Sequence, residues 1–75
     1  MGRLAGFKYN QVRKKLIKLG LIFEREGKGS HEIWYYPITD RFTVLPHHGS
    51  KDIKEGTLKA VLMQAGIGTD DFLNC

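Results

Sequence analysis

The chain has 75 residues and a formal net charge of +4 at neutral pH. This length suits one small domain with a modest core and excludes a two-domain enzyme. Apolar residues make up 41% and charged residues 27%, a balance typical of a soluble globular chain rather than a disordered or membrane-spanning one. We therefore expect a single domain over residues 1–75, with a core at about 8–67 and a short C-terminal tail at 68–75.

The single cysteine, Cys75, stands last in the sequence and can close no internal disulfide. Neither this residue nor the three histidines, His31, His47 and His48, have the spacing of a zinc site, so we expect no metal and no cofactor. No charged and then apolar leader opens the sequence. The expected location is the reducing cytoplasm, with no membrane association.

Positive charge is concentrated near the start of the chain. Residues 1–19 contain six Lys or Arg and no acid, whereas residues 20–75 contain six Lys or Arg and eight Asp or Glu. A positive face attracts phosphate, and this attraction provides much of the affinity of proteins for nucleic acids. A solvated helix face that only maintains solubility is the alternative explanation.

The first element is an amphipathic helix over 11–19. Asn10 is the expected N-cap, because its side chain can accept from the first free amides. The apolar stripe has the spacing i, i+4 and i+7, at Val12, Leu16 and Leu19. Gly20 is the expected left-handed C-cap.

Three strands joined by short turns follow. They are predicted over Leu21–Glu26, His31–Tyr36 and Arg41–Leu45. Glycines in the first turn allow the positive φ of a tight hairpin, and aromatic residues make the middle segment the strongest strand signal. Pro46 ends the third strand, because proline cannot donate to a ladder.

A second helix is predicted over 54–65 and ends at Gly66. Its apolar positions are spaced i, i+3, i+4 and i+7, at Leu58, Val61, Leu62 and Ala65. A short final turn is expected to begin at Thr69 and to run through Phe72 and Leu73.

The order is therefore helix, three strands, helix. Short turns make the three strands antiparallel neighbours, and a sheet with one apolar face needs a cover. We predict an α+β two-layer sandwich in which two helices cover one face of a three-stranded antiparallel sheet. This αβββα order is also that of double-stranded-RNA-binding domains.

Residue parity divides the middle strand into two faces but does not say which one is buried. Trp34 and Tyr36 share one face, and His31, Ile33 and Tyr35 share the other. If Ile33 faces the helices, the first pair lies on the open face and could stack bases or dock a protein. The same parity would then turn His31 toward the helices.

His31 is the sharpest candidate for catalysis. No pair of acids has acid/base spacing, and Lys28 lies in a glycine turn that lacks the other residues of a phosphate-binding loop. His31 begins the middle strand directly after this turn, and an imidazole can accept or donate a proton near neutral pH. A histidine that only hydrogen-bonds to the turn is the structural alternative.

His47 and His48 follow Pro46 on the loop after the third strand. A solvated loop pair is the plain interpretation of such neighbours. If the loop folds beside His31, one or both would grip phosphate or assist proton transfer.

Several motifs occur in order along the chain. They are Gly29-Ser30-His31-Glu32-Ile33-Trp34-Tyr35, Thr43-Val44-Leu45-Pro46 with His48, Glu55-Gly56-Thr57-Leu58, and Leu62-x-Gln64-Ala65-Gly66-Ile67. Together they resemble the HicA (YcfA-like) toxin family over nearly the whole chain. That family is similar in fold to double-stranded-RNA-binding domains and consists of small endoribonucleases that cleave messenger RNA. Its members are held inactive by a HicB antitoxin.

The resemblance also implies roles for individual residues. His31 occupies the position of the catalytic histidine, and Gly29 and Ser30 match the turn that sets it. His48 fits a Pro-x-His that is frequent after the third strand of family members. Apart from the resemblance, one histidine must act as both base and acid or share proton transfer with a second group, for which Lys28, Tyr35 and His48 are the candidates.

The predicted protein is thus the toxin of a type II toxin–antitoxin system, a metal-independent endoribonuclease that cleaves mRNA through His31. The predicted RNA-binding residues are Lys14, Lys18, Lys28, Ser30 and His48. The expected partners are mRNA and a HicB-type antitoxin, with the chain a monomer alone or part of a hetero-oligomer with the antitoxin. A non-catalytic RNA-binding module of the same fold, and a protein-interaction domain that uses the aromatics of the middle strand, are the alternatives.

Overall fold

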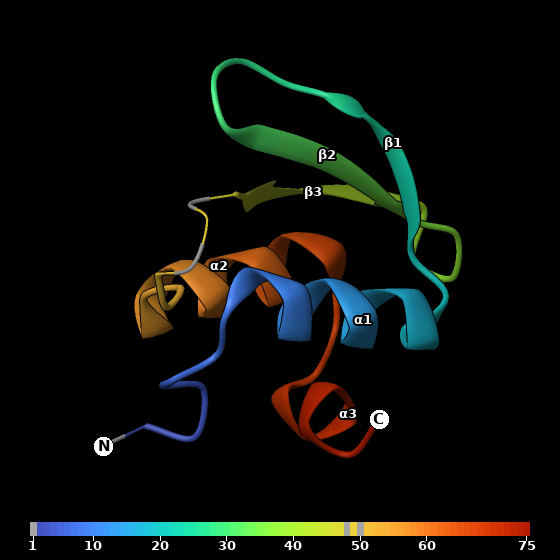
Figure 1. Ribbon diagram of the computed structural model, residues 1–75. Helices are drawn as coiled ribbons and strands as arrows, with labels where there is room; N and C mark the ends of the chain where they lie inside the picture. Colours follow the sequence, from blue (N-terminus) through green and yellow to red (C-terminus); the bar gives the residue numbers. More distant parts are fainter. Residues whose placement is uncertain (1, 48, 50) are drawn as a thin grey trace.

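The computed structural model describes residues 2–47, 49 and 51–75 and consists of one sheet and three helices (Figure 1). The elements in chain order are α1 (Tyr9–Leu19), β1 (Ile22–Glu26), β2 (His31–Tyr36), β3 (Arg41–Pro46), α2 (Glu55–Ala65) and α3 (Thr69–Leu73). Every predicted helix and strand is present, and each bound lies within two residues of the predicted one.

The N-terminal bound of α1 differs most from the prediction. The helix begins at Tyr9 with Lys8 as its N-cap, and the Lys8 amide donates to the Gln11 side-chain oxygen at 2.9 Å. The prediction that Asn10 caps this helix is therefore wrong. The Gln11 side chain accepts from the Lys8 amide, so the helix begins before Asn10 and that residue already lies within it.

The three strands form one antiparallel sheet in the order β1-β2-β3, with β2 in the centre. The β2–β3 ladder is regular from Tyr36 opposite Arg41 to His31 opposite Pro46. The β1–β2 ladder contains an irregularity between Phe23 and Arg25. The start of β2 therefore lies beside the end of β3 at one end of the sheet.

All three helices lie on the same side of the sheet. Figure 1 shows α1 and α2 packed below the sheet and α3 below them, on the side away from the strands. The other face of the sheet is not covered by any described element. The predicted α+β class, with a three-stranded antiparallel sheet and helices on one face, is confirmed.

Burial settles which face of β2 meets the helices. Glu32, Trp34 and Tyr36 are buried, whereas Ile33 and Tyr35 are partly exposed and His31 is exposed. The arrangement with Trp34 and Tyr36 on the open face is therefore wrong, and with it their use in stacking bases or docking a protein. Packing these two large rings against the helices removes a large apolar surface from water, and Trp34 is only 1% exposed.

The core lies between the sheet and the helices and continues to α3. Phe72 of α3 is fully buried and packs edge-on against Phe7, with ring centroids 5.3 Å apart. The C-terminal segment expected as a short tail thus contributes a core side chain. Among the described residues, no helix is long and apolar enough to cross a bilayer.

Candidate functional site

His31 is placed at the end of the sheet by the turn that precedes it. The amide of Gly27 donates to the His31 carbonyl at 2.8 Å, and the His31 amide donates to the Lys28 carbonyl at 3.3 Å. Gly29 has φ +60°, a left-handed conformation that glycine adopts without strain. The hairpin therefore fixes the backbone at the first residue of β2.

The side chain of His31 is accessible. It is exposed and, by strand parity, shares the open face with Ile33 and Tyr35. Within the described part of the chain, no hydrogen bond, ion pair or ring contact engages its imidazole. Both ring nitrogens are thus available to a ligand.

A backbone contact joins this turn to the end of β3. The amide of His47 donates to the carbonyl of Ser30 at 2.6 Å. The residue before the candidate catalytic histidine and the residue after Pro46 therefore lie side by side. The condition set for these histidines, that the loop after β3 folds beside His31, holds for the backbone of His47, whereas His48 lies outside the described residues.

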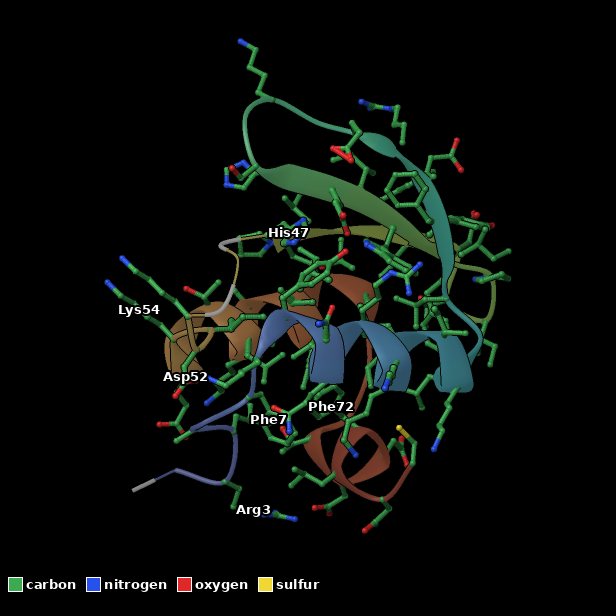
Figure 2. The ribbon with its side chains drawn as sticks, viewed as in Figure 1. Arg3, Phe7, His47, Asp52, Lys54 and Phe72 are labelled. Atoms are coloured by element: carbon green, nitrogen blue, oxygen red, sulfur yellow. The ribbon has the colours of Figure 1, made fainter. Side chains whose placement is uncertain are left out.

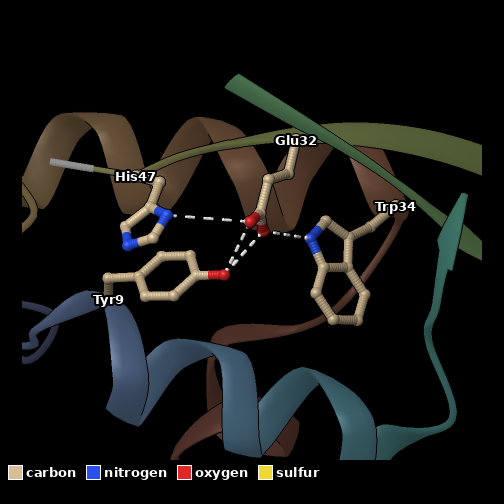
Figure 3. A network of polar contacts seen from close by, with 4 residues as sticks. All are labelled: Tyr9, Glu32, Trp34 and His47. Carbon is tan, nitrogen blue, oxygen red and sulfur yellow. Dashed lines mark hydrogen bonds and ion pairs between the residues drawn. The ribbon is translucent and has the colours of Figure 1, made fainter. Parts of the chain in front are cut away.

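On the covered face, a buried carboxylate lies at the centre of a polar network (Figure 3). The Tyr9 hydroxyl lies within hydrogen-bond distance of both carboxylate oxygens of Glu32, at 2.8 and 2.7 Å. The Trp34 indole N–H donates to one of these oxygens at 3.1 Å. Nδ1 of His47 lies 3.8 Å from the other oxygen, and its ring stacks on Tyr9 with centroids 3.8 Å apart.

The environment of Tyr9 keeps its hydroxyl protonated. Burial, and then the hydrogen bond to Glu32, raise the pKa of Tyr9 to about 12 from its ordinary value of 10.0. Because the phenol stays neutral at physiological pH, it can serve as a donor to the carboxylate.

A cleft of about 630 Å³ opens beside His47. Its lining residues are Ser30, Pro46, His47, Lys51, Asp52, Ile53, Lys54 and Thr57. Figure 2 shows His47 at the end of β3, and Asp52 and Lys54 on the segment that leads into α2. The cleft therefore lies between the end of the sheet that carries His31 and the start of α2.

Comparison with known proteins identifies the family. Residues 9–67 match the HicA toxin family of bacterial toxin–antitoxin systems. The chain belongs to the HicA toxin family. It is also 37% identical over 60 residues to a protein named "Probable mRNA interferase HicA" from Pseudomonas fluorescens (strain Pf0-1), an alignment that covers 80% of this chain and 95% of that relative.

In this HicA chain, the predicted basic residues do not all gather at His31. Lys28 and Ser30 belong to the turn that precedes it. Lys14 and Lys18 are exposed on α1, in the helical layer beneath the covered face, and no contact between described residues joins them to β2. They contribute positive charge at a distance from the histidine.

Tyr35 is not placed to assist His31. It lies near the opposite end of β2, and its hydroxyl donates to Asp40 at 2.6 Å. This hydrogen bond, the largest cause, raises the pKa of Tyr35. Its expected role as a helper in proton transfer is therefore wrong.

No role for Tyr9 or Glu32 was predicted from the sequence, although Glu32 lies within one of the quoted motifs. Glu32 shares the buried face of β2 with Trp34 and Tyr36. Once that face is known, an acid on it indicates a buried polar contact, because a buried carboxylate needs hydrogen-bond partners. No local pattern marks Tyr9, which is far from Glu32 in the sequence. In the described part of the chain, no group of three or more His, Cys, Asp or Glu could hold a metal ion.

Proposed function

We propose that this HicA family member is the toxin of a type II toxin–antitoxin system and cleaves messenger RNA through His31. The observation that carries the proposal is the accessible imidazole of His31, which lies at the exposed end of the central strand with no partner among the described side chains. Membership of a toxin family and the mRNA interferase name of a relative support the same activity.

The chemistry proposed is transesterification within the RNA strand. His31 accepts the proton of a ribose 2′-hydroxyl, and the oxygen attacks the adjacent phosphorus. The bond from phosphorus to the 5′-oxygen breaks, and that oxygen takes up a proton from the protonated His31 or from a second group beside it, which leaves the site with no net gain or loss of protons for the next turnover. The products are a 2′,3′-cyclic phosphate, or its hydrolysed form, and a 5′-hydroxyl. This route requires no metal ion.

Cations stabilise the negative charge that grows on the phosphorus oxygens. Lys28 and Ser30, in the turn before His31, are the proposed contacts nearest the reacting phosphate. His48, which lies outside the described residues, remains a proposed RNA-binding residue. Lys14 and Lys18 are proposed to attract the backbone through the field of α1, since phosphate contacts and charge dominate such affinities.

The proposed regulator is an antitoxin of the HicB type, with which the chain would form a hetero-oligomer. The basic balance of this chain predicts an acidic contact surface on that partner. We propose that the protein acts in the cytoplasm and that its first five elements, in the order αβββα, form a fold like that of double-stranded-RNA-binding domains.

Cleavage of a long RNA by wild type and His31→Ala in the presence of EDTA tests the proposal. We expect the substitution to reduce the cleavage rate at least about 100-fold, the usual contribution of a general acid or base. Wild-type protein should leave 2′-O-methyl RNA intact, because that substrate lacks the attacking hydroxyl.

Equal cleavage by both proteins would remove His31 from the mechanism. Binding of RNA without cleavage by either protein would favour the non-catalytic RNA-binding module. Because His31 is exposed, the two proteins should unfold at the same temperature, and this comparison controls for misfolding.

A further inference from the structure

Glu32 occupies a position that ordinarily takes an apolar residue. It alternates with Trp34 and Tyr36 on the covered face of β2, and it is only 7% exposed. Burying a carboxylate costs several kcal/mol unless charge and hydrogen bonds compensate for the lost water. The contacts of this side chain therefore indicate what it does.

Two of its partners are neutral. Tyr9 and Trp34 supply hydrogen bonds to the carboxylate, but neither carries charge at neutral pH. Among the described residues, His47 is the one basic side chain within ion-pair distance of Glu32, with its Nδ1 at 3.8 Å. The carboxylate thus faces one nitrogen of an imidazole.

The orientation of His47 is fixed from three directions. Its ring lies nearly parallel to that of Tyr9, at an interplanar angle of 12°, and its amide donates to Ser30. With Nδ1 turned toward Glu32, Nε2 is turned away from the network (Figure 3). The side chain is 49% exposed, so this second nitrogen remains open to a ligand.

The cleft next to this ring is suited to an anion. Lys51 and Lys54 line it, and neither forms an ion pair with another described residue. The lining also contains the hydroxyl groups of Ser30 and Thr57. The one carboxylate in the lining, Asp52, is held by Lys8 at 2.8 Å.

We propose that this cleft is a phosphodiester-binding subsite of the RNA site, in which His47 and Lys54 contact a backbone phosphate and Glu32 and Tyr9 position the His47 ring. The proposal rests on the proposed RNA-cleaving function. Ser30 both lines the cleft and precedes His31, so the subsite would hold a phosphate next to the one that is cleaved. Glu32 acts as a positioning residue, because it lies behind His47.

A 2′-O-methyl oligonucleotide, which cannot be cleaved through its 2′-oxygen, measures binding to this subsite. The matched pair is Lys54→Ala and Lys59→Ala: each removes one lysine charge near the start of α2, and only Lys54 lines the cleft. We expect Lys54→Ala to weaken binding about 5-fold and to reduce the slope of log affinity against log salt by about 0.7. Lys59→Ala should change affinity less than about 2-fold.

A double-mutant cycle tests the positioning role. His47→Ala and Glu32→Gln should each weaken binding of the oligonucleotide, by about 5- to 10-fold and about 3-fold respectively. In the His47→Ala background, Glu32→Gln should have no further effect on binding, since its action passes through the ring. A carboxylate that only stabilised the fold would leave the affinity of the folded protein unchanged in both backgrounds, and one that acted on RNA independently of the ring would give additive losses.

Wild-type affinity in both Lys54→Ala and His47→Ala would overturn the subsite. Additive losses in the cycle would overturn the role of Glu32. If Glu32→Gln does not fold, Tyr9→Phe replaces it in the cycle. Failure of the proposed function is distinguishable, because it would appear as cleavage of ordinary RNA that does not depend on His31, while the binding measurements remain valid.

Discussion

At the residue scale, the main feature is a buried carboxylate whose contacts come from three parts of the chain. Tyr9 at the start of α1, Trp34 on the same strand and His47 after β3 converge on Glu32. Each contact satisfies part of a charge that the core would otherwise exclude. The same side chains that stabilise the fold therefore orient a group at the candidate site.

The raised pKa of Tyr9 predicts that the stability of the fold changes at alkaline pH. Its pKa is raised from 10.0 to about 12, so between these values the folded state holds a proton that the unfolded state has lost. The stabilising effect is complete below pH 10 and is lost as the pH rises toward 12. Relative to Tyr9→Phe, wild type should lose about 2 kcal/mol of unfolding free energy over this range.

Urea denaturation at several pH values measures this loss. Titration of the lysines is common to both proteins and cancels in the comparison. A constant difference between wild type and Tyr9→Phe from pH 9 to about 12 would contradict the proposed protonation of the phenol.

At the element scale, the two long helices end as their glycines predict. Gly20 and Gly66 have φ of +104° and +78°, values that side chains disfavour. Gly66 is also closely packed, because a Cβ there would meet the Thr39 methyl at 3.0 Å. Thr39 donates to the Ala65 carbonyl at 2.6 Å, so the end of α2 is bound to the turn between β2 and β3.

The same substitution should have opposite effects at the two ends of α2. Gly66→Ala introduces left-handed strain and a tight contact, and we expect it to destabilise the fold by about 1–2 kcal/mol. Gly56→Ala adds a methyl group in open space within the helix, and we expect it to stabilise the fold by about 0.5 kcal/mol. Thermal unfolding of the two variants measures both effects, and equal shifts would contradict this account of the helix end.

At the scale of the whole molecule, the basic residues of α1 lie away from the candidate catalytic histidine. Lys14 and Lys18 lie on α1 beneath the covered face, whereas His31 shares the open face. Electrostatic interactions through solvent fall off over the Debye length, which is about 8 Å at physiological salt. The field of α1 therefore reaches RNA at the far side of the molecule mainly when salt is low.

This separation predicts a salt-dependent effect of charge reversal. The double variant Lys14→Glu/Lys18→Glu should weaken oligonucleotide binding about 10-fold at about 50 mM salt, and the loss should shrink at about 300 mM. The matched variant Lys59→Glu/Arg41→Glu changes the net charge equally at exposed sites outside α1. Equal losses in both variants would assign the effect to net charge alone.

Much of this arrangement follows from local pattern. The spacing of apolar residues and the glycines set the order of elements, and each strand is short enough that turns make its neighbours antiparallel. The position of His31 at the start of β2 also follows, because the glycine turn and the aromatic run meet there. The largest misplacement is the first turn of α1, where Gln11 rather than Asn10 satisfies the free amide, whereas β1, β3 and α2 differ from the prediction by one residue at one end.

The sequence by itself determined the elements, their order and the place of His31, because these depend on contacts between residues near each other in the chain. Only the tertiary structure decided which face of β2 is buried, since period-2 alternation is the same for either face. The same holds for the Glu32 network. Its carboxylate is stable in the core only where Tyr9 and His47, both distant in sequence, join Trp34 of the same strand through the packing of α1 and the end of β3 against one face of the sheet.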